Sequence, residues 1–261
     1  MIFASGLGRP EGPVLLPDRS WLIVERGPGL GCLTHIGADG RDRRILVETG
    51  RPNALAIDGD GAIWVTESVN PPSLLRATMD GRVEVFVTGC GDEPFLWPND
   101  LCFGPEGALY MTDSGIPAGD WAQLGPEEQR TASTDGRLYR IDVSDKTVEK
   151  LDSGLAFTNG IAFGPDRNLY VSTTLDGMVH RYRWRQGGVV GEREEFGNVT
   201  DPELPPAFRG PDGMAFGVDG NLYVAVAWQG DVTVLGPDGA VARRMKMAGP
   251  SPSNVAFGPP G

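Results

Sequence analysis

Short apolar segments recur along the chain, and each begins with a polar residue at the same place. Six copies of this phrase occur: RPEGPVLL, RPNALAID, WPNDLCFG, FTNGIAFG, GPDGMAFG and SPSNVAFG. The first five are followed by a turn and a second apolar segment, as in GAIWVTES and GALYMTDS. Short apolar runs bounded by turn residues are typical of β-strands. The pattern therefore predicts a repeated pair of strands with one polar side chain at each entrance.

The spacing of the repeat indicates the fold. The polar residues are Glu11, Asn53, Asn99, Asn159, Asp212 and Asn254. They lie 42, 46, 60, 53 and 42 residues apart (53−11, 99−53, 159−99, 212−159, 254−212). Repeats of about 40 to 50 residues are typical of four-stranded propeller blades. We therefore expect an all-β protein, a six-bladed β-propeller of four-stranded antiparallel blades, with residues 1–261 forming a single domain.

The two ends of the chain are expected to meet in the last blade. The opening MIFASGLGRPEG resembles an outermost strand followed by an inner-strand entrance. Such an N-terminal strand would complete the last blade and remove an exposed edge. That blade would begin at SPSNVAFGPPG and lacks about two of its four strands in this sequence, so we expect it to be incomplete. A five-bladed ring with a C-terminal tail is the alternative.

The longest interval contains an inserted segment, GIPAGDWAQLGPEEQRTASTDG, at residues 115–136. An antiparallel meander reverses direction at each turn, so the loop after a second strand lies on the same face as the inner-strand entrance. We expect the insertion to form a lid beside the polar ring, with Trp121 on the lid. Asp113 and Ser114 should lie on the same face.

Composition and charge narrow the choice of partners. The 38 Gly and 22 Pro residues disfavour long helices. The net charge of −12 (35 acidic minus 23 basic) argues against a nucleic-acid partner, which requires a basic footprint. No apolar run is long enough to span a membrane, and the first residues do not resemble a signal peptide. With an odd count of three cysteines, the expected location is the cytoplasm, and the oligomeric state is left open.

The polar ring predicts a metal site. If the blades close around an axis, the side chains of Glu11, Asn99, Asn159 and Asp212 converge on it. Two carboxylates and two amides are hard oxygen donors, which suit Ca²⁺. Zn²⁺ would prefer His or Cys, and none occurs at these positions. We expect one divalent cation, Ca²⁺ first, with Mg²⁺ or Mn²⁺ as alternatives. The competing interpretation is that each residue only bonds local backbone in an Asx turn.

The phrases PEGPV (10–14), PNDL (98–101), TNGIAFGPD (158–166) and PDGMAFGVDGNLYVA (211–225) resemble the senescence marker protein/gluconolactonase family. The resemblance covers essentially the whole chain and implies a six-bladed, calcium-dependent lactonase. It implies that Glu11, Asn159 and Asp212 bind the metal and that Asn99 faces metal and substrate. It also makes Asp212 the general base or nucleophile, with Asp100 beside the site as a further catalytic candidate.

One position departs from the family pattern. In the sugar-lactone members an arginine precedes the Asn-Asp pair by two residues and contacts substrate hydroxyls, whereas this chain has Trp97. Together with Trp121 and Trp228, Trp97 suggests a more apolar or aromatic ester as substrate. Packing between blades is the alternative role for these rings. Asn53 is expected to line the pocket or to form a turn, and Asp113 is a candidate for substrate contact.

These observations lead to a hypothesis of a calcium-dependent hydrolase, a lactonase or esterase. Asp212 would take a proton from water or attack directly, while Asn99 and the cation stabilise the developing oxyanion. Two alternatives stay open. The same groups could hydrolyse a phosphotriester, as in diisopropylfluorophosphatase, which has a similar ring. A non-catalytic propeller that binds a small molecule or a protein is the other, although it has no need for two converging carboxylates.

Overall fold

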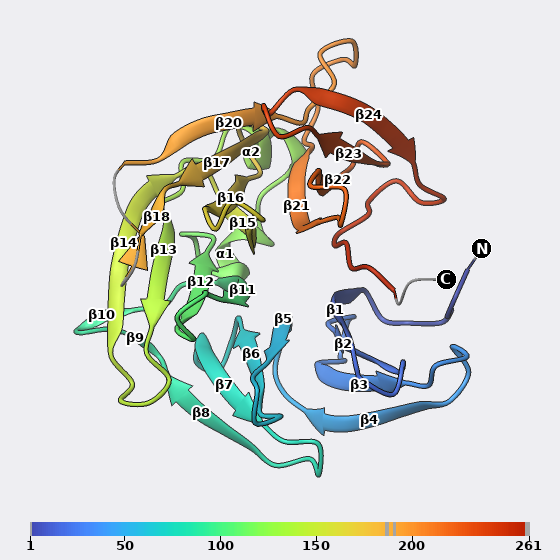
Figure 1. Ribbon diagram of the computed structural model, residues 1–261, viewed down its shortest axis with the longest axis vertical. Coiled ribbons are helices and arrows are strands. Elements are labelled where there is room, and N and C mark those ends of the chain that lie inside the picture. The colour runs from blue at the N-terminus through green and yellow to red at the C-terminus, as the bar shows by residue number, and fades with distance from the viewer. Residues whose placement is uncertain (1, 186–187, 190–191, 259–261) are drawn as a thin grey trace.

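Five four-stranded antiparallel blades surround a common centre in the computed structural model, which describes residues 2–185, 188–189 and 192–258 (Figure 1). The blades are, in chain order: β1 (Pro10–Leu15), β2 (Trp21–Glu25), β3 (Cys32–Ile36) and β4 (Arg43–Glu48); β5 (Pro52–Ile57), β6 (Ile63–Glu67), β7 (Ser73–Ala77) and β8 (Val83–Val87); β11 (Pro98–Phe103), β12 (Leu109–Asp113), β13 (Gly136–Ile141) and β14 (Val148–Leu155); β15 (Thr158–Phe163), β16 (Leu169–Thr173), β17 (Met178–Tyr182) and β20 (Glu194–Asn198); and β21 (Gly210–Phe216), β22 (Leu222–Ala227), β23 (Asp231–Leu235) and β24 (Val241–Lys246). Within a blade, strands pair in sequence order, the inner strand first.

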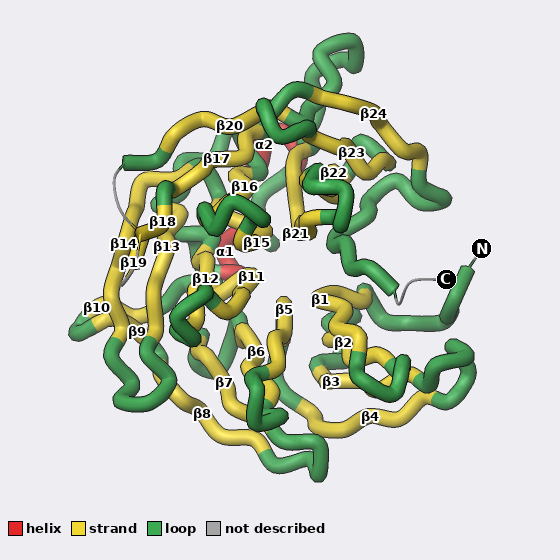
Figure 2. Tube along the Cα trace, viewed as in Figure 1, coloured by secondary structure: helices red, strands yellow, loops and turns green. Residues whose placement is uncertain are grey.

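Few other elements are present. Two short hairpins lie between blade strands, β9 (Gly89–Cys90) with β10 (Glu93–Pro94), and β18 (Trp184–Arg185) with β19 (Gly188–Val189). Figure 2 shows how little helix accompanies the strands. None of the helices in the described ranges has the length and apolar content that a membrane-spanning helix needs.

The hydrophobic core lies between neighbouring blades rather than inside one layer. Between the first two blades, Leu22 and Val24 pack with Ile63 and Val65, and all four are buried. Equivalent clusters lie between each following pair of blades up to the fifth. The second strand of a blade has neighbours on both faces, which explains why these strands read as nearly continuous apolar runs.

Buried hydroxyl groups join the blades as well. In three second strands a Ser or Thr interrupts the apolar run and donates to a backbone oxygen of the next blade's inner strand. The bonds are Thr66 Oγ1 to Asn99 O (2.7 Å), Thr112 Oγ1 to Asn159 O (2.6 Å) and Ser172 Oγ to Asp212 O (2.9 Å). In each case the acceptor belongs to the polar residue of the repeat.

The expected count of six blades is wrong for the described residues, which form five, as in the alternative interpretation. The sixth copy of the phrase, at 251–258, contains no strand. It lies between the inner strands β21 and β1, because Ser253 O accepts from Gly213 N (2.8 Å) and Ser253 Oγ donates to Pro10 O (3.3 Å). A strand is defined by backbone pairing, and no described strand pairs with this segment. The incomplete sixth blade is therefore not confirmed.

The N-terminal segment does not close a last blade. Residues 2–9 contain no strand and lie against the first blade (Figure 1). Two groups hold them there, since Glu25 Oε2 accepts from Gly8 N (2.5 Å) and Arg43 Nη1 donates to Gly6 O (2.9 Å). Phe3 also packs edge-on against Trp21. The local repeat pattern did not reveal these contacts because they depend on the side chains of β2 and β4.

The inserted segment between β12 and β13 carries two short helices, α1 (Ala118–Trp121) and α2 (Pro126–Arg130). Trp121 is buried and packs against Phe157 and Phe208, which belong to later parts of the chain. The insertion is therefore fixed by aromatic packing. That the inserted segment acts as a lid over the ring stays a prediction.

Glu25→Gln should lower the free energy of unfolding by about 2 kcal/mol at pH 7, because a buried charged acceptor is lost. The Glu25 carboxylate accepts from Gly8 N, from Thr34 Oγ1 (2.7 Å) and from Arg43 Nη2 (2.5 Å). Denaturant unfolding of both proteins measures the difference. Glu84→Gln is the control, because the Glu84 side chain is 65% exposed.

The difference in unfolding free energy between the wild type and Glu25→Gln should disappear at low pH. Burial alone would raise the pKa of Glu25, but the hydrogen bonds from Gly8, Thr34 and Arg43 outweigh it and lower the pKa. A lowered carboxyl pKa stabilises the fold above the unfolded value of about 4.3. That stability is lost as the pH falls through the folded pKa. A difference that stays constant down to pH 3 would contradict this assignment.

Candidate functional site

Every inner strand is irregular where its polar residue lies. The antiparallel register shifts at this point in all five blades. The shifts lie between Glu11 and Val14, Pro52 and Ala54, Pro98 and Leu101, Thr158 and Ile161, and Pro211 and Met214. A β-bulge bends a strand and redirects its side chains, and bulges are common beside functional sites. The bulges explain how polar residues from strands with apolar surroundings come to face one another.

Small residues next to the bulges let the inner strands approach closely. A Cβ atom on Gly160 would overlap the carbonyl oxygen of Asp212, and one on Gly12 would lie 2.8 Å from Cα of Ala54. Any larger residue at these positions would push the neighbouring strands apart. The close approach therefore keeps polar side chains from different blades within reach of one another.

Two asparagine side chains are oriented by hydroxyl groups of their own blades. Asn99 Nδ2 donates to Ser114 Oγ (2.9 Å), and Asn159 Nδ2 donates to Thr174 Oγ1 (3.1 Å). Ser114 Oγ donates onward to Thr158 O (3.0 Å) in the next blade, so the relay crosses from blade to blade. Fixing the nitrogen of each amide leaves its oxygen, Oδ1, on the opposite side as an acceptor.

Asn53 belongs to the same network. Its Nδ2 donates to Asn99 Oδ1 (2.9 Å), and its Oδ1 accepts from Trp97 Nε1 (3.4 Å). Asn53 and Asn99 are buried, at 5% and 4% exposure. The structure thus brings together Asn53, Asn99 and Trp97 from the predicted site, with Asn53 between the aromatic side and the polar ring.

The acidic residues of the ring influence one another. Burial raises the pKa of Asp212 well above its usual value, and the charge of Glu11 adds to this. Burial likewise raises the pKa of Asp100 to about 7, opposed by hydrogen bonds from the backbone N–H groups of Leu101 and Ile161. Glu11 also contributes to the Asp100 shift. Three carboxyl groups from the first, third and fifth blades therefore share one electrostatic environment.

Arg26 lies at the ring, and the sequence analysis did not single it out. Its Nη2 lies 2.6 Å from Glu11 Oε1, and the charge of Asp212 also acts on it. The repeat carried a signal for it. Arg26 follows its second strand and lies fifteen residues after Glu11, the spacing from Asn99 to Ser114 (114−99 = 15). In the fifth blade this place is taken by Ala227, which offers no polar group to Asp212.

The predicted aromatic residues are mostly packed against protein. Trp97 and Trp121 both contact Phe157, with ring centroids 5.4 and 4.5 Å apart. Trp97 is only 4% exposed and Trp121 only 8%. The two rings thus leave little surface for a substrate. Trp228, by contrast, is 59% exposed.

The carboxylate of Asp113 is hydrogen-bonded to backbone N–H groups. Its carboxylate accepts from the N–H groups of Leu96 (2.7 Å), Trp97 (3.1 Å) and Gly115 (2.9 Å). Glu67 plays the equivalent part in the second blade, where it binds the backbone just before Asn53. These carboxylates hold the loop that leads into the inner strand. The structure does not bring Asp113 into the ring, and its contact with substrate stays a prediction.

The donor set of the ring fits a hard divalent cation. Within the described ranges no three His, Cys, Asp or Glu side chains are grouped so as to hold a metal ion. A cation here would therefore rely on amide oxygens beside the carboxylates of Glu11 and Asp212, a combination that Ca²⁺ accepts. Asn159 suits this role because no hydrogen bond to its Oδ1 is formed by the described residues. Arg26 engages one oxygen of Glu11, Oε1, and the other remains.

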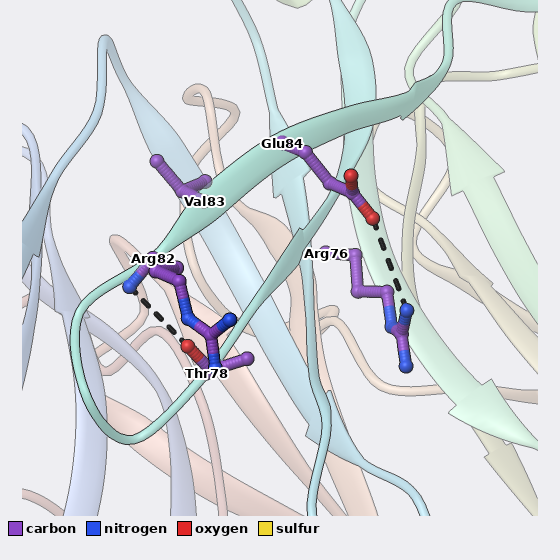
Figure 3. A pocket seen from close by; sticks show the side chains of 5 residues that line it. All are labelled: Arg76, Thr78, Arg82, Val83 and Glu84. Carbon is purple, nitrogen blue, oxygen red and sulfur yellow. Dashed lines mark hydrogen bonds and ion pairs between the residues drawn. The ribbon is translucent and has the colours of Figure 1, made fainter.

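Two of the larger hollows formed by the described residues lie outside the ring. One, of about 650 Å³, is formed on the outer strands β7 and β8 by Arg76, Thr78, Arg82, Val83 and Glu84 (Figure 3). It lacks the converging acidic and amide groups of the ring, and its Arg76–Glu84 pair is long, at 3.8 Å. The other, of about 500 Å³, is lined by Arg26 and therefore adjoins the ring.

Comparison with known proteins agrees with the blade architecture. Residues 69–261 match the SMP-30/gluconolactonase/LRE-like region. Pentonolactonase XacC of Haloferax volcanii is 30% identical over 96% of this chain and 77% of its own length. The gluconolactonase of Zymomonas mobilis is 25% identical over 91% of this chain and 69% of its own length. A calcium-binding regucalcin from Agrobacterium tumefaciens has a similar structure, with a TM-score of 0.76 at 20% identity over 98% of this chain and 80% of its own.

Ser114→Ala should lower the free energy of unfolding by about 1–2 kcal/mol, because Asn99 Nδ2 and Thr158 O each lose a buried partner. Urea unfolding measures the loss. Ser144→Ala removes an exposed hydroxyl that bonds only Asp142, and should change stability by less than about 0.5 kcal/mol. Equal behaviour of the two variants would mean that the relay does not hold Asn99.

Proposed function

The chain belongs to the SMP-30/gluconolactonase/LRE-like family, and from that premise we propose that it is a metal-dependent hydrolase that opens a lactone or a related ester. Two named relatives, a pentonolactonase and a gluconolactonase, support a lactone as the substrate class. The observation that carries the proposal is the meeting of the Glu11 and Asp212 carboxyl groups with oriented amides in one electrostatic environment. A pure binding surface has no need to bring such groups together.

The proposed cofactor is one divalent cation, Ca²⁺ before Mg²⁺ or Mn²⁺. Glu11, Asn159 and Asp212 would hold it, with Asn99 Oδ1 as a further oxygen. The description of the similar regucalcin as a calcium-binding protein supports Ca²⁺. When bound, the cation would polarise the ester carbonyl as a Lewis acid.

Asp212 is the proposed general base. The residue fifteen positions after Asp212 is Ala227, so this blade has no hydroxyl or charged group at the place where Ser114 and Arg26 stand in theirs. A carboxylate has two oxygens, so one can accept a proton from water while the other serves the cation. General-base catalysis of this kind contributes about 10²- to 10⁴-fold to the rate.

Asn99 is the proposed partner of the substrate oxygen. One N–H of its amide nitrogen donates to Ser114 Oγ, and the second N–H is free to donate to the oxyanion as it develops. Asn53 and Ser114 hold the amide from two sides, so it need not reorganise during the reaction. Asp100 is held by the N–H groups of Leu101 and Ile161, and we assign it to positioning β11 against β15.

Asp212→Asn should reduce kcat/KM by about 10²- to 10⁴-fold on any lactone that the protein hydrolyses, because the amide cannot accept the proton of water. The substitution keeps size and shape, so a circular dichroism spectrum checks folding. Asp60→Asn is the matched control, since Asp60 lies in an exposed turn and should leave turnover unchanged. Full activity in Asp212→Asn would refute the proposed base.

Removal of divalent cations should abolish lactonase activity, and added Ca²⁺ should restore it. The physical reason is that the ester carbonyl would lose the cation that polarises it. Metal content is measured by mass spectrometry before and after chelation, and activity is assayed on a panel of small lactones. Activity that survives complete removal of metal would contradict the cofactor while leaving the lactonase proposal intact.

A further inference from the structure

A cleft of about 500 Å³ adjoins the ring and is unusually basic for this protein. Three arginines line it: Arg9 at the start of β1, Arg26 after β2 and Arg51 before β5. Ala122, just after helix α1, also lines it, so the inserted segment borders the cleft. The volume falls in the usual range for small-molecule sites. A basic cleft stands out in a chain of net charge −12.

Only part of the positive charge of the cleft is held in ion pairs by the described residues. Arg26 pairs with Glu11, but neither Arg9 nor Arg51 forms an ion pair in the described part of the chain. The charge of Glu67 acts on Arg51, but its carboxylate accepts from the backbone N–H groups of Gly50, Arg51 and Val69. Burial, followed by the charges of Arg26 and Arg9, lowers the pKa of Arg51. Because the positive charges of Arg9, Arg26 and Arg51 act on one another, an anion between them would be bound favourably.

Buried polar atoms also lack partners here. Arg26 Nε and Thr49 Oγ1 are buried, and neither has a hydrogen-bond partner among the described residues. Both residues line the cleft. An unsatisfied buried donor costs about 1–3 kcal/mol, so such groups usually serve a ligand or an ordered water. The cleft thus offers a donor and a hydroxyl beside two arginines without counter-charges.

We propose that this cleft binds an anionic group of the substrate, a carboxylate or a phosphate, so that the preferred substrate is an acidic lactone. The inference rests on the proposed lactonase function and narrows its substrate class. Arg26 links the two parts of the site, because it touches Glu11 in the ring and lines the cleft. The ester carbonyl would lie at the ring while Arg51 and Arg9 hold the anionic end.

The experiment compares kcat/KM within two matched pairs that differ in the anionic group at carbon 6. The pairs are D-glucono-1,5-lactone with its 6-phosphate, and D-glucono-1,4-lactone with D-glucaro-1,4-lactone. The wild type should prefer at least one acidic lactone by roughly 10-fold or more, and which one identifies phosphate or carboxylate. Arg51→Gln should lose most of that preference, so that acidic and neutral lactones approach equal kcat/KM, and Arg9→Gln should act in the same direction. Arg41→Gln, at an exposed residue outside the cleft, is the control. Equal rates for acidic and neutral lactones would overturn the inference.

A binding measurement separates this inference from the proposed function. Calorimetry compares D-glucose 6-phosphate and D-glucuronate with neutral D-glucose, on the wild type and Arg51→Gln. Tighter binding of an acidic sugar, lost in Arg51→Gln, supports the cleft even if no lactone is hydrolysed, in which case only the proposed function fails. Binding that is absent, or equal for acidic and neutral sugars and for both proteins, overturns the inference whatever the lactonase assay gives.

Discussion

The fold and the site depend on one contact between blades, the hydrogen bond from a buried hydroxyl to the carbonyl of a bulged residue. A bulge leaves backbone groups unpaired in its own blade. A buried hydroxyl without a partner is equally costly. Thr66, Thr112 and Ser172 meet both needs, because each donates to the polar residue of the next inner strand. The bulges at Asn99, Asn159 and Asp212 are thus each supported by a hydroxyl group of the preceding blade.

Much of this arrangement could be predicted from the sequence. The apolar periods and turns predicted the blade strands. The polar phrase identified Glu11, Asn53, Asn99, Asn159 and Asp212, and the structure shows that the inner strands are bulged at these residues. These features are local and repeat, so a single sequence reveals them. The blade count failed because strand pairing is not local, and the segment at 251–258 carries the phrase without a pairing partner in the described chain.

The residues that escaped prediction are those whose role depends on distant parts of the chain. Arg26 follows an ordinary strand. Its contact with Glu11 and its position in the lining of the cleft become visible only in the folded structure. Trp97 and Trp121 suggested an aromatic substrate, yet both are buried against Phe157. The sequence alone does not show whether a tryptophan ring packs against protein or against a ligand, because burial of the ring is favourable in both cases.

Trp97 also contacts Arg51. The Arg51 guanidinium lies over the Trp97 ring, 5.1 Å from its centroid, a favourable cation–π geometry. Trp97 Nε1 in turn donates to Asn53, and Asn53 donates to Asn99. Sugar-lactone members have an arginine at the position of Trp97. In this chain the edge of the site still carries positive charge, although a tryptophan stands there. Trp97 carries an arginine from the preceding blade instead, and it connects that charge to the polar ring through two buried amides.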